Sequence, residues 1–332
     1  MRNTRVVLTA LGGPEVLKVI EDDVREPGAN ELRIRILACG VAFADVLMRR
    51  GLYSGVPALP YSPGYDIGGV VDACGSGVTQ WKQGDLVAAL MQTGGYSRYT
   101  VLPQSELVRV PAGLDPAEAV SLVLNYTTAY QMIHRIAKLR QGESVLIHGA
   151  AGGVGTAALQ LGALVELKMF GTASRPKHDL VAALGGVPID YRTEDFVQRA
   201  AGVDAVFDPI GGRHWMRSYR ALGKGGRFIG YGMSAALDGG RRNMMLAAAS
   251  FAWLGLVGLL PAKSARWYSI TTDKKKNPEW FREDLSRLLA MLQEKSIRPV
   301  VAERLALRDA PRAHELLEKS SVSGKIVLMC QE

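Results

Sequence analysis

The 332-residue sequence predicts an α/β fold, in which a doubly wound parallel sheet follows an antiparallel, barrel-like β domain. Three observations support this prediction. The first 110 or so residues contain short β patterns and frequent turns, with apolar and polar residues alternating at 32–36. A short apolar run at 144–148 leads into a glycine-rich turn and then a helical pattern from about residue 154 to 164. Strand and helix patterns then alternate, which is typical of a parallel sheet covered by helices.

The elements follow one another in an order that fits this fold. Near Pro116 the β-rich pattern gives way to a helical one at 116–139, with Ala, Leu and Ile on one face. After the turn, short apolar runs alternate with helical patterns, as buried parallel strands and their crossover helices do. Asn277 and Pro278 predict the start of a late helix, as its N-cap and first residue. The remaining predicted elements are strands at 169–172, 204–207, 227–231 and 325–329 and a helix near 309–319.

Length and composition exclude several classes of protein. The chain is longer than one hydrophobic core usually covers, so two domains are expected. Hydrophobic residues make up 48% and charged residues 22%, which is ordinary for a globular protein and argues against disorder. The net charge is +8, but the densest basic run is 274–276 and no recognition motif accompanies it. We therefore expect no nucleic-acid partner.

The cysteines and the first residues indicate a compartment. Cys39, Cys74 and Cys330 are too few and too scattered for a disulfide framework or a zinc cluster. The first residues, MRNTRVVLTALGG, lack the apolar run of a signal peptide. A reduced, cytoplasmic location is therefore expected.

The glycine-rich turn at 149–155 has the position and composition of a pyrophosphate site in a Rossmann-type domain. Glycines let phosphates approach the backbone, and N–H groups at a helix N-terminus bind them. The turn departs from the usual G-x-G-x-x-G pattern, because Ala150 stands where the first glycine would be. The alternative is a tight strand–helix turn without a ligand. The candidate binding residues are Gly149, Ala150, Gly152, Gly153, Val154 and Gly155.

The end of the second strand predicts which dinucleotide binds. An NAD site usually has an acid there, about 20 residues after the turn, that accepts the ribose 2′-hydroxyl. The corresponding residue is Ala173, and Ser174 and Lys177 follow it, with Arg175 as an outer support. Hydroxyl and cationic groups suit a 2′-phosphate. The sequence therefore predicts NADPH over NADH, the alternative being that Lys177 is a solvated lysine at a helix start.

Motifs spread over nearly the whole chain resemble those of one known family. They resemble the medium-chain dehydrogenase/reductase superfamily, in its zinc-independent quinone oxidoreductase branch, the zeta-crystallin relatives. Within that branch, residues 170–178 look closest to the vesicle amine transport protein homologues. The motifs lie at 40–45, 51–53, 63–71, 148–155, 190–191, 208–212 and 324–328.

The resemblance implies how the chain is divided. It implies a GroES-like catalytic domain at 1–122 and a Rossmann NADPH-binding domain at 123–264. Residues 265–332 would then return to complete the catalytic domain. Members of this family are commonly homodimers, so a homodimer is expected.

The resemblance also implies further cofactor contacts. Tyr191 matches the residue that contacts the 2′-phosphate together with Ser174 and Lys177. Thr128 lies in a stretch similar to the one beside the nicotinamide. These matches add two residues to the candidate NADPH site.

The positions that hold zinc in other members of the superfamily carry different residues here. The matching positions are Ala42, the pair Tyr65-Asp66 and Leu124. Neither an alanine nor a leucine side chain can bind zinc. Residues 75–110 contain no cysteine, so the lobe that holds a structural zinc is also missing. We therefore expect no metal.

A reaction without a metal favours reduction of a conjugated carbonyl or quinone, because nothing obvious would stabilise an alkoxide. The nicotinamide would supply the hydride to an apolar carbonyl or quinone substrate. The candidate catalytic residues are Tyr53, Tyr65 and Asn125. The alternative for either tyrosine is a packed aromatic ring, and Asn125 would substitute for an asparagine that family members often have at Ala42.

Residues 244–261 contain no charge, and basic residues lie on both sides, at 241–242 and Lys263. One interpretation is a helix near the substrate cleft or a dimer interface. The other is peripheral contact with a membrane. This second interpretation supports an alternative function, a membrane- or lipid-associated protein of the same fold with little catalytic activity.

Overall fold

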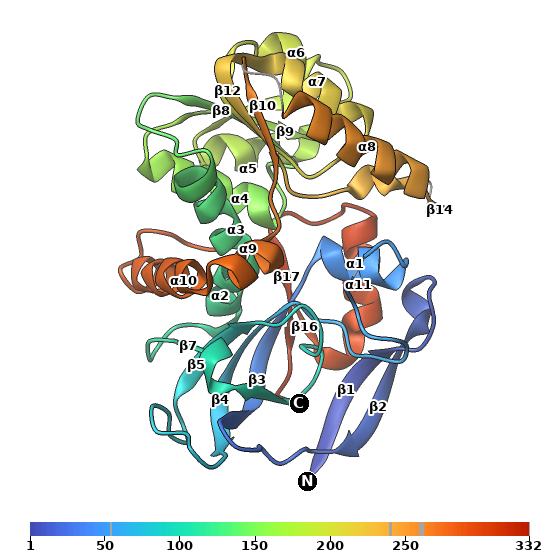
Figure 1. Ribbon diagram of the computed structural model, residues 1–332, viewed down its shortest axis with the longest axis vertical. Helices are drawn as coiled ribbons and strands as arrows, with labels where there is room; N and C mark the ends of the chain where they lie inside the picture. The colour runs from blue at the N-terminus through green and yellow to red at the C-terminus, as the bar shows by residue number, and fades with distance from the viewer. Residues whose placement is uncertain (54, 239–240, 259–261, 332) are drawn as a thin grey trace. The chain divides into compact units, whose positions relative to one another are not determined.

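The computed structural model describes residues 1–53, 55–238, 241–258 and 262–331 (Figure 1). The chain divides into two compact units, one of residues 1–127 with 277–332 and the other of residues 128–276. The boundaries differ from those that the family resemblance implies, at 122 and 265. The return to the first unit starts later because Ser264–Trp267 forms β15, the last strand of the sheet in the second unit.

A mostly antiparallel sheet of seven strands and a separate hairpin form the first unit. The hairpin is β1 (Arg2–Leu8) with β2 (Leu17–Asp23), and the sheet contains β3 (Glu31–Val41), β4 (Asp66–Cys74), β5 (Leu86–Leu90), β6 (Tyr99–Pro103), β7 (Val108–Arg109), β16 (Val301–Ala306) and β17 (Lys325–Met329). The alternation predicted at 32–36 is confirmed, because Leu32, Ile34 and Ile36 are completely buried. These residues belong to a core that also contains apolar residues of β1, β4 and β17.

Helices of the first unit follow the sequence pattern closely. The run predicted at 116–139 is helical to Ile136, as α2 (Pro116–Ser121), η3 (Leu122–Tyr126), α3 (Thr127–Tyr130) and η4 (Gln131–Ile136), of which α3 from Thr128 on and η4 belong to the second unit. It starts at 116 because a carboxylate oxygen of Asp115 accepts the N–H groups of Ala117 and Glu118. Two of its turns, η3 and η4, are π-helical. The other helices of this unit are α1 (Phe43–Arg49), α10 (Pro278–Gln293) and α11 (Ala310–Glu318).

A six-stranded parallel sheet forms the centre of the second unit. Its strands are β8 (Ser144–His148), β9 (Lys168–Ala173), β10 (Gly186–Asp190), β11 (Val203–Asp208), β12 (Leu222–Gly230) and β15. Their order is β10-β9-β8-β11-β12-β15, so the chain runs outward from β8 in one direction and then in the other. This order is that of the doubly wound nucleotide-binding fold, which confirms the predicted fold class. The main crossover helices are α4 (Gly153–Leu164), α5 (His178–Ala183), α7 (Arg213–Ala221) and α8 (Met244–Val257), drawn from green to orange in Figure 1.

The uncharged stretch at 244–261 forms α8 over most of its length. The helix begins where the side chain of Asn243 accepts the N–H of Leu246 at 2.9 Å. Residues 259–261 of the predicted stretch lie outside the described residues. Among the described residues, no helix combines the length and the apolar character that a membrane crossing requires.

Candidate functional site

The turn between β8 and α4 packs tightly against the first residues of that helix. Gly149 has φ of +64°, a conformation that favours glycine. A Cβ atom on Gly155 would lie 2.3 Å from the carbonyl oxygen of Gly149 and 2.6 Å from the Cα of Ala150. Both glycines are therefore required by the backbone, as a phosphate-binding turn demands.

Ala150 fits where the usual pattern has a glycine because the facing residue has no side chain. Its N–H donates to the carbonyl oxygen of Thr172 at 3.0 Å, and the residue is completely buried. A Cβ atom on Gly171 would lie 2.7 Å from the Cβ of Ala150. Gly171 on β9 therefore leaves room for the methyl group of Ala150 in the turn.

Helix α4 begins without a side-chain cap. Its N-cap residue is Gly152, which has extended backbone and no side chain to accept an N–H group. The first N–H groups of a helix need partners from outside the helix, and an anion at this end also interacts favourably with the helix dipole. Gly153 and Val154 supply two of these groups. The turn therefore fits a pyrophosphate.

Two candidate residues for the 2′-phosphate directly follow the ends of the neighbouring strands β9 and β10. Ala173 and Asp190 are register partners in this parallel pair, so Ser174 and Tyr191 each follow the carboxyl end of a strand at the same edge. Tyr191 is 53% exposed, and the guanidinium of Arg192 lies 5.7 Å from its ring centre. No acid stands at Ala173, in keeping with a site for a phosphate.

Lys177 lies in the short helical turn η5 (Arg175–Lys177), directly after Ser174 and β9. Its side chain is half-buried, and this burial lowers the pKa of the ammonium. A partly desolvated cation gains more from an anionic ligand than a fully solvated one. The arrangement fits the predicted recognition of a 2′-phosphate.

A buried hydrogen-bond network that the sequence did not predict joins the ends of β8, β9 and β11. The ring of His148, at the end of β8, lies 3.0 Å from both the Thr172 hydroxyl and the Ser218 hydroxyl. Ser218 donates to Asp208 at 2.6 Å, so the hydroxyl accepts from Nε2–H of His148. Burial lowers the pKa of His148 to about 3, which keeps the ring neutral. The sequence contained a signal for this network, since His148 and Asp208 lie within the family motifs at 148–155 and 208–212.

His214 completes this network and gives it the composition of a possible metal site. Its Nδ1 lies 2.7 Å from the same oxygen of Asp208. Burial of Asp208 would raise its pKa, but the hydrogen bond from His214 and the neighbouring imidazoles bring that pKa below the ordinary value. The ligand atoms of His148, Asp208 and His214 all lie within 4.8 Å of one another. The Ser218 hydroxyl makes hydrogen bonds to all three, so the cluster is filled by a side chain.

Two candidate catalytic residues, Tyr53 and Tyr65, are in direct contact. Their hydroxyl oxygens are 2.6 Å apart, a hydrogen bond in which either can be the donor. The rings meet edge to face, with centres 6.2 Å apart. Tyr65 is almost completely buried and Tyr53 is half-buried. The first unit therefore holds a coupled pair of phenols.

Asn125, the third candidate, lies next to a buried ion pair. The ammonium of Lys325 is 3.0 Å from Oδ2 of Asp66 and 3.5 Å from Oδ1 of Asn125. Since its oxygen faces this cation, Asn125 can offer its amide N–H groups elsewhere. Burial raises the pKa of Asp66, although the Lys325 ammonium opposes that shift. Lys325 belongs to the family motif at 324–328, but the motif alone indicated no role for it.

The residues at the zinc positions do not fit a zinc ion. Ala42 and Leu124 carry no donor atom. Tyr65 is hydrogen-bonded to Tyr53, and Asp66 is paired with Lys325. Two of the four positions thus lack a donor, and the other two have protein partners.

The candidate residues are divided between the two units. Tyr53, Tyr65 and Asn125 belong to the first unit. Thr128 is buried in α3 and belongs to the second unit, as do all residues predicted to hold the cofactor.

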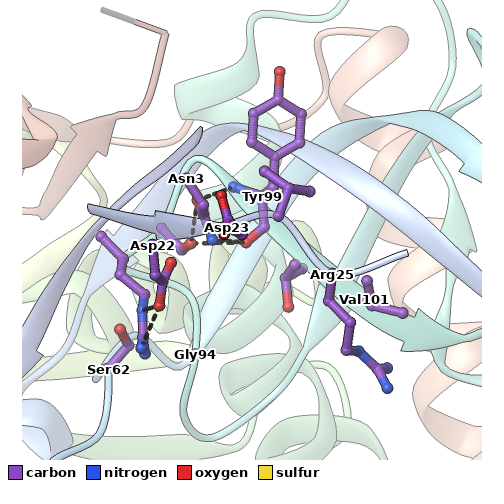
Figure 2. Close-up of a pocket in the computed structure, with 12 residues that line it drawn as sticks. Asn3, Asp22, Asp23, Arg25, Ser62, Gly94, Tyr99 and Val101 are labelled. Carbon is purple, nitrogen blue, oxygen red and sulfur yellow. Dashed lines mark hydrogen bonds and ion pairs between the residues drawn. The ribbon is translucent and has the colours of Figure 1, made fainter. Parts of the chain in front are cut away.

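A separate cavity of about 240 Å³ lies in the first unit, and none of the candidate residues is among those that line it (Figure 2). Asp22 pairs with Arg5 at its wall. Asn3 donates to the carbonyl oxygen of Tyr99 at 3.2 Å, and Ser97 donates to the same oxygen at 2.7 Å. These three interactions join polar side chains of the cavity wall to partners within the protein.

Comparisons with known proteins agree with this architecture. Residues 28–112 match the family model described as alcohol dehydrogenase GroES-like domain, and residues 184–328 match the one described as zinc-binding dehydrogenase. The mouse synaptic vesicle membrane protein VAT-1 homolog is 35% identical over 337 residues, covering 98% of this chain and 83% of its own length. Rat quinone oxidoreductase is 31% identical over 340 residues, covering 99% of this chain and 98% of its own.

The chain belongs to the medium-chain dehydrogenase/reductase superfamily, in the branch of quinone oxidoreductases and VAT-1 homologues. Among solved members of the superfamily, Escherichia coli quinone oxidoreductase complexed with NADPH is similar with a TM-score of 0.88 and 29% identity, covering 98% of this chain and 100% of that chain. Human VAT-1 homolog-like protein is similar with a TM-score of 0.85 and 29% identity, over 100% of this chain and 99% of that chain. The superfamily and branch expected from the motifs are thus confirmed.

Proposed function

We propose that the protein is a zinc-independent, NADPH-dependent reductase of quinones or α,β-unsaturated carbonyl compounds. The observation that carries this proposal is the strand–turn–helix at 149–155, whose glycines are required by the backbone and whose helix starts without a side-chain cap. A related quinone oxidoreductase whose structure is described as complexed with NADPH supports the cofactor. The residues at the zinc positions support a reaction without metal.

Each part of the cofactor has candidate residues in the second unit. When bound, NADPH supplies a hydride from its nicotinamide. Backbone N–H groups of the turn would hold the pyrophosphate, and three side chains would hold the 2′-phosphate. Thr128 would contact the nicotinamide. The turn residues are Gly149, Ala150, Gly152, Gly153, Val154 and Gly155, and the 2′-phosphate residues are Ser174, Lys177 and Tyr191.

The phenol pair of the first unit can stabilise and protonate the substrate oxygen. As the conjugated carbon accepts hydride, the carbonyl oxygen gains negative charge and needs a hydrogen-bond donor. We assign this contact to Tyr53, the more exposed phenol, with Tyr65 donating to Tyr53 from behind. The Tyr53 proton passes to the substrate oxygen, and water returns a proton to the phenolate. Asn125 offers an amide N–H group to the same oxygen.

NADPH consumption by the purified protein tests this proposal. The substrates are a panel of apolar quinones and enones, with saturated ketones and alcohols as controls. We expect oxidation of NADPH with quinones or enones only, no loss of rate in the presence of a chelator, and weaker binding of NADH. If no quinone or enone causes oxidation of NADPH, the proposed reductase activity is wrong. Stoichiometric zinc in a metal analysis would contradict the metal-free reaction.

We also propose a cytoplasmic homodimer without a nucleic-acid partner. The family resemblance supports the dimer, and light scattering of the purified protein measures it. Cys39, Cys74 and Cys330 are all free thiols in the structure, which suits a reducing compartment. A monomeric mass across the concentration range would contradict the dimer.

A second candidate function, contact with an anionic membrane surface, is favoured by the exposed side of α8. Met245 is 84% exposed, Leu256 66% and Phe251 44%. Beside this helix lies α7, where Trp215 packs 6.0 Å from Phe251 between ring centres (Figure 1). The exposed cations of α7 are Arg213, Arg217 and Arg220. An apolar helix next to basic residues suits a membrane that carries negative lipids.

Co-sedimentation with vesicles separates the two functions. If the second is correct, the protein should sediment with vesicles of phosphatidylcholine and phosphatidylserine and not with phosphatidylcholine alone. The double substitution Met245→Ser with Leu256→Ser should abolish sedimentation. Leu164→Ser, at an exposed leucine of α4, is the matched control and should leave it unchanged. Reductase activity without sedimentation would support the first function and contradict the second.

A further inference from the structure

Asp45 is a completely buried carboxylate at the start of α1 that takes no part in the proposed proton transfer. Its Oδ2 accepts the N–H of Ala42 at 2.9 Å. Its Oδ1 accepts the N–H of Gly64 at 3.0 Å. One side chain thus joins two chain segments that are separated by about 20 residues of sequence.

The first of these segments carries Tyr53. Ala42 is the residue before α1, so its bond to Asp45 closes the first turn of that helix. At the other end, the N–H of Leu52 donates to the carbonyl oxygen of Leu47 at 2.8 Å. Tyr53 is the next residue. The position of this phenol therefore depends on how α1 is held.

The second segment carries Tyr65. Gly64 has φ of +105°, and a Cβ atom there would lie 2.6 Å from the backbone nitrogen of Tyr96. The N–H of Tyr96 donates to the carbonyl oxygen of Pro63 at 2.9 Å. Gly64 is therefore closely enclosed, and its bond to Asp45 fixes the backbone directly before Tyr65.

A chain of buried side chains directs a third donor at Asp45. Nε of Arg49 donates to Nδ1 of His314 at 3.2 Å, so the proton of this imidazole is on Nε2. Nε2 then donates to the Tyr96 hydroxyl at 3.0 Å, and that hydroxyl donates to Oδ2 of Asp45 at 3.4 Å. The hydrogen bonds all run toward the carboxylate, as expected for a group held in place as an acceptor.

We propose that Asp45 is a positioning residue, whose carboxylate holds Tyr53 and Tyr65 at hydrogen-bond distance for the transfer of a proton to the substrate. The inference rests on the proposed reductase function for its kinetic consequence. Its geometric part, the dependence of the phenol pair on Asp45, stands on the contacts alone.

Asp45→Asn is the direct test, because it keeps the shape but leaves only one oxygen to accept the two backbone N–H groups. We expect kcat for quinone or enone reduction to fall about tenfold, with NADPH affinity and substrate KM within about twofold. The matched control is Asp85→Asn, since Asp85 also accepts a backbone N–H, from Lys82, in the same unit. This control should keep the kcat of the unmodified protein.

A readout without turnover uses protein labelled with ¹³C at the Cζ atoms of tyrosine. We expect Asp45→Asn to shift the resonances of Tyr53 and Tyr65, assigned by Tyr53→Phe and Tyr65→Phe, and Asp85→Asn to leave them in place. If the phenol resonances shift in a protein that reduces nothing, the reductase is wrong and the positioning contact is right. Unshifted resonances and normal kcat in folded Asp45→Asn would overturn the inference.

Tyr96→Phe keeps the test decisive if Asp45→Asn does not fold. It removes the hydroxyl that donates to Asp45 and leaves the ring and both backbone bonds. We expect a smaller change in the same direction, with kcat lowered about threefold and the same two resonances shifted. No change in either measurement would overturn the inference.

Discussion

The ammonium of Lys325 lies 3.0 Å from a carboxylate oxygen of Asp66, and both side chains are almost completely buried. The pair connects β17 to β4 through two residues that are 259 positions apart in the sequence. Room for it exists because the neighbouring residue is Gly40, where a Cβ atom would lie 2.3 Å from the Lys325 side chain and 2.4 Å from Asp66. Asp66 is thereby committed to a cation of the protein itself.

Lys325→Met is expected to destabilise the protein strongly, because it leaves the Asp66 carboxylate buried without its partner. Removal of one member of a buried ion pair costs about 3–5 kcal/mol. The free energy of unfolding by urea measures this effect. Lys319→Met is the matched control, since Lys319 is exposed and its pairing with Glu315 at 3.8 Å should contribute less than about 0.5 kcal/mol. Equal losses in the two variants would contradict the prediction.

Gly155→Ala is expected to damage the turn itself. Its Cβ atom would meet the carbonyl oxygen of Gly149 at 2.3 Å, so either the turn or α4 must move. We expect a loss of about 1–3 kcal/mol of unfolding free energy. NADPH affinity, measured by fluorescence titration, should fall about tenfold as the N–H groups lose their arrangement. Gly255→Ala in α8 is the control, because the added carbon meets no atom within 4 Å beyond the adjacent residues and backbone of its own helix, and it should not weaken binding.

Lys177→Ala is expected to weaken NADPH binding while leaving NADH binding unchanged. The proposed partner of this ammonium is the 2′-phosphate, which only NADPH has. Loss of one charge-assisted contact should raise the Kd for NADPH about tenfold. Calorimetric titration with both dinucleotides measures the difference. Lys168→Ala, at the exposed start of β9, is the control. A parallel loss of NADH affinity would show that Lys177 does not recognise the 2′-phosphate.

Local patterns in the sequence were sufficient to predict the turn and the sheet around it. A strand, a glycine turn and a helix are set by residues a few positions apart, so 144–164 could be interpreted without other parts of the chain. That Gly171 leaves room for Ala150 could not be seen this way, because it depends on the β8–β9 register. The division at Asn277 between the two compact units depends on packing in a similar way. Whether β15 joins β12 is decided by packing.

The candidate catalytic residues show the same difference between what local sequence predicts and what only the fold reveals. The family motifs predicted Tyr53 and Tyr65 separately, and the structure adds that their hydroxyls are in contact. Lys325 received no role, because a lysine before an apolar run gives no sign of a partner in β4. The network around His148 was missed likewise, since its members come from three strands and a helix. Side-chain partners that are distant in sequence require the fold.

Because His148 is buried in this network, the free energy of unfolding is expected to fall as the pH is lowered. Burial lowers the pKa of His148 from its ordinary value of 6.5 to about 3. Below about pH 6.5 the unfolded chain binds a proton at this residue and the folded protein does not, so stability is present above that pH and is lost as the pH falls toward 3. Between pH 7 and pH 5 this one residue should remove about 2 kcal/mol of unfolding free energy.

His148→Asn should therefore show a smaller loss of stability between pH 7 and pH 5 than the unmodified protein, whatever its stability at pH 7. Urea unfolding at the two pH values measures the loss for each variant. Thr172→Val removes the hydroxyl next to Nδ1 but keeps the buried imidazole. Because burial is the main cause of the lowered pKa, this control should be less stable at both pH values and keep the full pH dependence. If the unfolding free energy of His148→Asn falls as much between pH 7 and pH 5 as that of the unmodified protein, groups other than His148 cause the pH dependence.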